Sequence, residues 1–289
     1  MLAFSALLGI AASSRGEDLQ ENIDVWTLLL QHSAPIRLIS PPLIIEGESS
    51  KLMPAPPIVS IIIDDLGYAF TPAEQLLAMP YDLTLAIIPF TPYGARIANL
   101  ANLNQREVML HAPMETLGAR KWEDGLTSDM IEESFTQRLL EMLLDIPHVA
   151  GINNHGGSRL TQETDKMDWT MTVLAQKQLY FVDSRTTAAS VTLGAALKAD
   201  VRFSKRDIFL DNDKSLTAIL SQIDKLRAIA HETGSAIAIG HPYPTTLQAL
   251  SITLPLLERD GIKVVKVSHL MRQASQFPPI LMTQSNLEK

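Results

Sequence analysis

The stretch Ile58–Tyr68, IVSIIIDDLGY, indicates the fold class, because a run of apolar residues ends in two adjacent carboxylates. Five of its first six residues are apolar and most are β-branched. A continuous apolar run of this kind is typical of a parallel strand that is covered on both faces. Since neighbouring side chains on a strand point to opposite faces, we expect one aspartate to point into the fold and the other across its mouth.

Short apolar runs recur along the chain and alternate with segments whose apolar residues have helical spacing. The later runs are LTLAIIP (83–89), EVMLH (107–111), VAGINN (149–154), LYFVDS (179–184), DIFLD (207–211), SAIAIGH (235–241) and IKVVKVS (262–268). Strands that alternate with helices form βα units and a parallel sheet. Seven or eight units predict an α/β fold with a (β/α) barrel of seven or eight parallel strands, and a doubly wound sheet is the alternative.

One helix is predicted in detail, over residues 128–146, SDMIEESFTQRLLEMLLDI. Ser128 and Asp129 are its expected capping residues, and Glu132 and Glu133 would lie in its first turn. Pro147 would end it.

The chain outside the barrel, which is expected over residues 58–275, divides into three segments. Residues 1–15 begin with MLAFSALLGIAASS, which is too short to span a bilayer (about 20 residues) and is similar to a secretory signal. Residues 16–57 are rich in proline and are expected to form a largely disordered tether, and residues 276–289 a C-terminal tail. The mature protein is therefore expected to be secreted or periplasmic, without a transmembrane helix.

Composition argues against nucleic-acid binding and excludes metal sites built from cysteine. The formal net charge is −8 and no run of basic residues is present, so nucleic acid is not an expected partner. The chain has no cysteine, so that any metal must be held by histidine, aspartate or glutamate.

Polar residues with catalytic chemistry follow the apolar runs, where the active site of a parallel barrel lies. Taken alone, single aspartates such as Asp183 and Asp211 are typical of helix caps. Two or three histidines with a carboxylate at one rim are the ligand set of a catalytic zinc or a similar divalent ion. The residues that follow the runs are Asp64, Asp65, His111, Glu115, Asn153, Asn154, His155, Asp183, Ser184, Arg185, Asp211 and His241.

The motifs IDDLGY, EVMLHAPME, GINNHGGS, YFVDSRT, DIFLD and AIAIGHPYPTT keep an order and spacing that resemble the divergent polysaccharide deacetylases. The resemblance covers roughly residues 58–270. It implies a distorted (β/α) barrel, an exported protein and metal-dependent hydrolysis of N- or O-linked acetyl groups on a cell-envelope polysaccharide. The partner would be an acetylated polysaccharide or oligosaccharide, and the cofactor a divalent metal, Zn²⁺ foremost.

By resemblance, Asp64 is the general base, Asp65 a metal ligand, His111 the first metal histidine and His241 the acid that protonates the leaving group. Typical members have a second histidine four residues after the first, where this chain has Glu115. We expect His155 to supply it instead.

Other strand-end residues are expected to orient this machinery or to contact substrate: Glu115, Asn154, Asp183 and Arg185. The departure at Glu115 leaves a second function open, a non-catalytic glycan-binding or envelope-associated protein on the same fold. A third is a metal hydrolase that cleaves an amide or ester outside sugars.

Overall fold

A computed structural model describes residues 55–118 and 124–276, which belong to one compact unit. The predicted signal segment lies outside these residues, as do the predicted tether up to residue 54 and the tail beyond residue 276. Within the described ranges, no helix has the length and apolar character that crossing a membrane requires.

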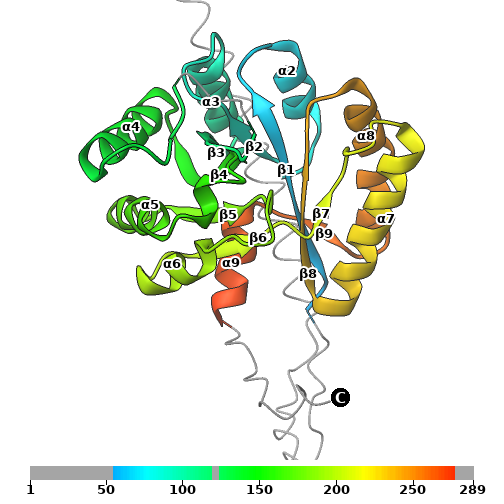
Figure 1. Ribbon diagram of the computed structural model, residues 1–289. Helices are drawn as coiled ribbons and strands as arrows, with labels where there is room; N and C mark the ends of the chain where they lie inside the picture. Colours follow the sequence, from blue (N-terminus) through cyan, green and yellow to red (C-terminus); the bar gives the residue numbers. More distant parts are fainter. Residues whose placement is uncertain (1–54, 119–123, 277–289) are drawn as a thin grey trace, which may run out of the picture. The chain divides into compact units, whose positions relative to one another are not determined.

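The core is a strongly curled sheet whose strand pairs are all parallel (Figure 1). Its order is β6-β5-β4-β3-β2-β1-β8-β7, and β9 pairs with β1. The prediction of a distorted parallel (β/α) barrel is therefore confirmed. Its two end strands are β6 and β7, which do not pair with each other. The strands are β1 (Ile58–Leu66), β2 (Thr84–Ile87), β3 (Glu107–Met114), β4 (Val149–Gly156), β5 (Tyr180–Asp183), β6 (Phe203–Lys205), β7 (Ile208–Phe209), β8 (Ser235–Gly240) and β9 (Lys263–Val264).

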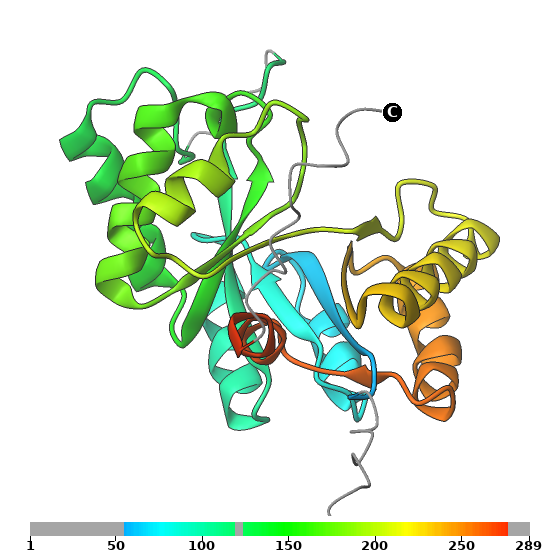
Figure 2. The same cartoon turned by 90° about the horizontal axis from the view of Figure 1, so that it is seen from below.

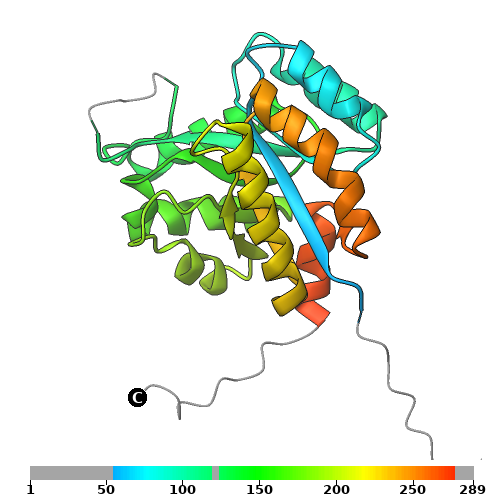
Figure 3. The same cartoon turned by 90° about the vertical axis from the view of Figure 1, so that its right-hand side faces the viewer.

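Helices follow most strands and cover the outside of the sheet, as Figure 3 shows for α7 and α8 beside β1. The helices are α2 (Thr71–Ala78), α3 (Gly94–Leu103), α4 (Glu132–Asp145), α5 (Thr164–Lys177), α6 (Thr192–Lys198), α7 (Leu216–Thr233), α8 (Pro244–Arg259) and α9 (Val267–Gln276), with a short 3₁₀ turn at Leu160–Gln162.

Helix α4 begins later than its sequence suggests. Its N-cap is Ile131, so the prediction that Ser128 and Asp129 cap it is wrong. The Ser128 N–H donates to Glu115 Oε2 at 2.6 Å and its hydroxyl accepts from Arg159. Because these contacts hold Ser128 beside β3, the helix starts only after this segment.

The two faces of the strands pack into two apolar clusters. In β1, Ile61 and Ile63 face the helices, whereas Ile58 and Ile62 face the barrel interior. The interior cluster also contains Val267 of α9. Figure 2 shows α9 across the end of the barrel opposite the strand C-termini. Helix α9 therefore closes the bottom and leaves the other end, where the polar residues gather, for the site.

Candidate active site

The two aspartates that end β1 both face the site. Asp64 continues the inward-facing series of Ile58 and Ile62 and is only 3% exposed. Asp65 has φ = 58°, and the pairing with β2 shifts register between Ile63 and Leu66. This irregularity breaks the strand alternation and turns Asp65 toward the histidines. Asp64 therefore lies inside the fold and Asp65 at its mouth, as expected, although strict alternation is not the reason.

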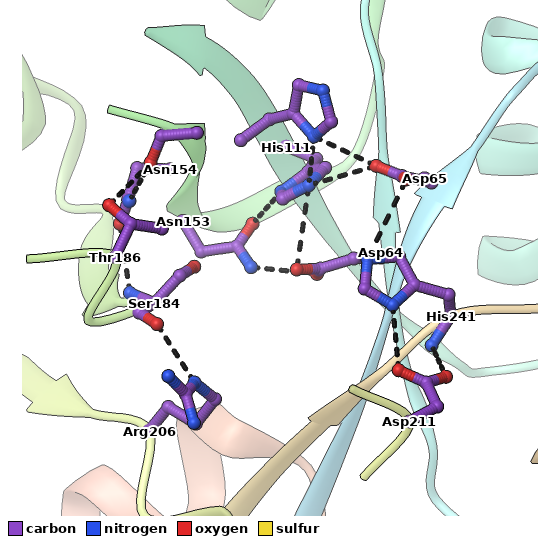
Figure 4. Close-up of polar contacts among 12 residues, drawn as sticks. Asp64, Asp65, His111, Asn153, Asn154, Ser184, Thr186, Arg206, Asp211 and His241 are labelled. Carbon is purple, nitrogen blue, oxygen red and sulfur yellow. Dashed lines mark hydrogen bonds and ion pairs between the residues drawn. The ribbon is translucent and has the colours of Figure 1, made fainter. Parts of the chain in front are cut away.

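Three ligand atoms from three strands converge beside Asp64 (Figure 4). Asp65 Oδ1 lies 3.3 Å from His111 Nε2 and 2.9 Å from His155 Nδ1, and the two histidine nitrogens are 3.0 Å apart. The three residues belong to β1, β3 and β4, and β2 lies between β1 and β3 in the sheet. The structure thus brings together the three residues that the sequence predicts as metal ligands.

This donor set fits a divalent ion. Zinc binds imidazole nitrogen and carboxylate oxygen at roughly 2.0–2.2 Å, which places tetrahedral ligand atoms about 3.3–3.6 Å apart. The three observed separations are at or a little below that range. Asp65 Oδ1 is buried and, among the described residues, accepts no hydrogen bond of good geometry. A buried carboxylate oxygen beside two imidazole nitrogens is suited to metal coordination.

Asn153 connects His111 to the buried Asp64. Its Nδ2 donates to Asp64 Oδ1 at 2.8 Å, which leaves its Oδ1 to accept from His111 Nδ1, also at 2.8 Å. The proton of His111 then lies on Nδ1, and Nε2 keeps its lone pair for a metal. The sequence showed that Asn153 follows a strand, but its role depends on its pairing opposite His111.

The carboxylates have opposite electrostatic environments. Burial raises the pKa of Asp64, and His111 and the Asn153 hydrogen bond oppose this rise only in part. Burial also acts to raise the pKa of Asp65, but its contacts with His111 and His155 outweigh burial and hold it well below the ordinary value. Asp64 thus has the higher proton affinity and Asp65 stays ionised.

His241 follows β8 and forms a dyad with Asp211. Its Nδ1 lies 2.9 Å from Asp211 Oδ1, and its Nε2 is 3.7 Å from Asp65 Oδ2. Burial acts to lower the pKa of His241, but Asp211, aided by Asp64 and Asp65, raises it overall. Asp211 also accepts from the His241 N–H and the Thr246 hydroxyl. It therefore orients His241, a role that the helix-cap reading of Asp211 missed.

Two of the other predicted residues anchor loops around the site. The Glu115 carboxylate binds the Ser128 N–H at 2.6 Å and lies 3.8 Å from Arg159 Nε, and the convergent ligand group does not include it. Asn154 Oδ1 accepts from the Ser184 N–H at 2.9 Å, which ties the end of β4 to the loop after β5.

Asp183 and Arg185 were expected to orient the catalytic machinery or to contact substrate. In the described structure neither side chain forms a hydrogen bond with Asp64. Asp183 Oδ1 accepts from the Arg185 N–H and its Oδ2 from the Thr192 hydroxyl, both at 2.7 Å, while the Arg185 side chain is exposed. The guanidinium that interacts with the charges of Asp64 and Asp183 belongs to Arg206. Arg206 follows β6, a three-residue strand without a sustained apolar run, which is why the sequence reading missed it.

A cavity of about 720 Å³ opens above these groups. Its lining includes Asp64, His111, His155 and His241, together with Ser184, Arg206, Phe209 and Gln222. Asp64, His241 and the two histidines of the convergent group therefore share one space that can admit a sugar-sized substrate.

The chain matches the family model of the divergent polysaccharide deacetylases over residues 61–271. It is 36% identical over 222 residues to an uncharacterized protein of Haemophilus influenzae, covering 76% of this chain and 79% of that protein. It is 33% identical over 216 residues to the uncharacterized protein YibQ of Escherichia coli, covering 74% and 67%.

Among solved structures, an uncharacterized protein of Agrobacterium tumefaciens shares the fold, with a TM-score of 0.72 and 24% identity over 75% of this chain and 89% of that one. The family match spans most of the chain and contains every residue of the site described above. The chain therefore belongs to the divergent polysaccharide deacetylase family.

Proposed function

We propose that this protein is an exported, metal-dependent hydrolase that removes N- or O-linked acetyl groups from a cell-envelope polysaccharide. The observation that carries the proposal is that Asp64 and His241, a base and an acid, line one cavity with His111 and His155, whose ring nitrogens converge with Asp65. Family membership supports the reaction class.

Asp65, His111 and His155 would hold the ion, and their two nitrogens and one oxygen suit Zn²⁺. When bound, such an ion supplies Lewis acidity, which polarises a carbonyl oxygen and lowers the pKa of water toward about 7.

Asp64 is placed to accept a proton from the attacking water. Asn153 holds its Oδ1, so Oδ2, 3.5 Å from His111 Nε2, is the oxygen directed at the site. The burial that raises its pKa strengthens it as a base.

His241 is placed to donate a proton to the leaving group. Asp211 holds its Nδ1–H, so Nε2 faces the cavity, and the raised pKa favours the protonated ring at neutral pH. An amine or alkoxide would take the Nε2 proton as the bond to the acetyl carbon breaks. Two groups with different proton affinities thus cover the two proton transfers.

The test is acetate release by the zinc-loaded protein from acetylated chitooligosaccharides and peptidoglycan fragments, with metal content measured on the same sample. We expect release that stops when the metal is chelated and returns when it is restored. A protein that holds a full metal complement but releases no acetate would contradict the proposal and favour the glycan-binding alternative. Glu115 is one motive for that alternative, and in our proposal His155 supplies the ligand atom that Glu115 does not.

A further inference from the structure

The proposed reaction does not use the wall of the cavity that Ser184 and Arg206 form. This wall lies at the opening of the sheet between β6 and β7, the two ends of the strand path. The chain crosses the opening at Arg206, whose N–H donates to Asp183 O of β5, and Asp207, whose N–H donates to Ile237 O of β8. Figure 4 shows Arg206 and Ser184 on the side of the site away from His241.

Arg206 is held rigidly and keeps donors for a ligand. Its Nε donates to Ser184 O at 2.9 Å and one Nη to Arg185 O at 3.4 Å, while the guanidinium carbon lies 4.8 Å from the Phe209 ring centroid. Arginine has five N–H donors, so these contacts leave most of the fork available. The half-buried guanidinium forms no ion pair with any residue of the described ranges.

The nearby carboxylates are already engaged by other donors. Asp183 accepts from the Arg185 N–H and Thr192, Asp64 accepts from Asn153, and the Asp207 Oδ2 accepts from the Ile237 N–H at 2.8 Å. Their charges act on Arg206, but none of them forms a hydrogen bond with it in the described structure. A half-buried cation in this position is stabilised by an anion that binds its free N–H groups.

Ser184 provides a second, independent donor at the same wall. The residue is 6% exposed and lines the cavity, yet its hydroxyl forms no hydrogen bond with the described residues. Buried hydroxyl groups are normally hydrogen-bonded, so an unpaired one in a cavity wall indicates a ligand.

We infer that Arg206 and Ser184 form a subsite for a carboxylate on the substrate, so that the enzyme acts on acidic acetylated glycans. The planar fork of Arg206 would bind the two carboxylate oxygens, and the Ser184 hydroxyl would donate to one of them. The carboxylate could belong to a uronic acid or to a lactyl ether on the acetylated sugar. This inference rests on the proposed deacetylation.

The experiment compares three acetylated substrates: an oligouronate, a glycan fragment with N-acetylmuramic acid, and a neutral chitooligosaccharide. For Arg206→Gln we expect kcat/KM to fall roughly 10–100-fold on whichever acidic substrate the enzyme uses, mainly through KM, and to fall much less on the neutral one, where only the interaction of Arg206 with the charge of Asp64 is lost. Ser184→Ala should give a smaller loss of the same selectivity. Lys205→Gln is the control, because Lys205 is exposed, outside the cavity lining, and carries the same charge.

Calorimetric binding of the deacetylated acidic fragments to wild type and Arg206→Gln gives a readout independent of turnover, and the variant should bind them more weakly. Equal losses on acidic and neutral substrates would overturn the inference and make Arg206 a group that tunes Asp64. A wild type that prefers the neutral substrate would also overturn it while leaving deacetylation intact. Absence of acetate from all three substrates with a full metal complement would instead contradict the proposed function.

Discussion

At the scale of single residues, the site separates the roles of two adjacent aspartates. Asp64 is buried against Asn153, while Asp65 lies against His111 and His155. Burial raises the pKa of Asp64, which suits its proposed role as a base, and the histidines keep Asp65 ionised, which suits its proposed role as a ligand. Substitutions can therefore separate proton transfer from metal binding.

Asp64→Asn should abolish turnover and leave metal binding nearly intact. The change is almost isosteric and removes the proton acceptor without touching Asp65, His111 or His155. Loss of a general base typically costs about 10²–10⁴-fold in rate. Acetate release and metal content of the same preparation check this. A variant that loses its metal would mean that Asp64 is the ligand and Asp65 the base.

Asp211→Asn should move the alkaline limb of the pH–kcat/KM profile to lower pH. The acid form of His241 is lost as pH rises through its pKa, which Asp211 holds above the ordinary value of 6.5. Without the Asp211 charge that pKa falls, so activity declines at a lower pH than in wild type. Profiles of both proteins on one substrate test this. An unchanged limb would show that His241 does not set it.

At the scale of elements, a polar network joins the floor of the barrel to α9. Glu107 at the start of β3 is 6% exposed and accepts from the Tyr180 and Thr84 hydroxyls at 2.9 and 3.2 Å. The Ser268 N–H in the first turn of α9 also donates to it, at 3.1 Å. A negative charge at a helix N-terminus is favourable, so Glu107 both caps α9 and satisfies buried hydroxyls.

Glu107→Ala should destabilise the fold by about 3 kcal/mol, because it leaves several buried donors unpaired. Urea unfolding measures this change in the free energy of unfolding. Glu107→Gln keeps one acceptor oxygen and should cost less. Glu232→Ala, at an exposed position of α7, is the control, with an expected change within about 0.5 kcal/mol. A Glu107→Ala variant as stable as this control would contradict the role of the network.

At the scale of the whole molecule, the proposed metal ligands come from three strands, β1, β3 and β4. Asp65, His111 and His155 are far apart in sequence and meet only in the folded barrel. An ion bound there would stabilise the native state and not the unfolded chain, so stability and metal occupancy should be linked.

Removal of the metal with a chelator should lower the melting temperature of wild type. Free zinc at 1,000 times its Kd would add about 4 kcal/mol to the free energy of unfolding. His155→Ala should lose both the metal and this dependence, whereas Glu115→Ala should keep both. Elemental analysis and thermal melts in zinc and in chelator provide the data. Full occupancy in His155→Ala with loss in Glu115→Ala would place Glu115 in the ligand set instead.

The sequence by itself determined most of the strands, their parallel arrangement and the rim at which the chemistry gathers. It missed β6, and it predicted a strand over residues 262–268, where β9 ends at Val264 and α9 begins at Val267. The correct predictions follow from local patterns: runs such as Ile58–Ile63 are recognisable without any knowledge of their neighbours, and the residue after such a run lies at the rim of any parallel barrel. Asp64, His111 and His241 were found in this way, with roles supplied by the family resemblance.

Only the tertiary structure decided which of these groups meet. His111 lies opposite Asn153 because of the register between β3 and β4. Asp65 faces the histidines because its backbone has a positive φ. Asp211 and Arg206 acquire their surroundings from residues of other strands. Register, bulges and loop crossings are set by the packing of segments distant in sequence, and no local periodicity records them.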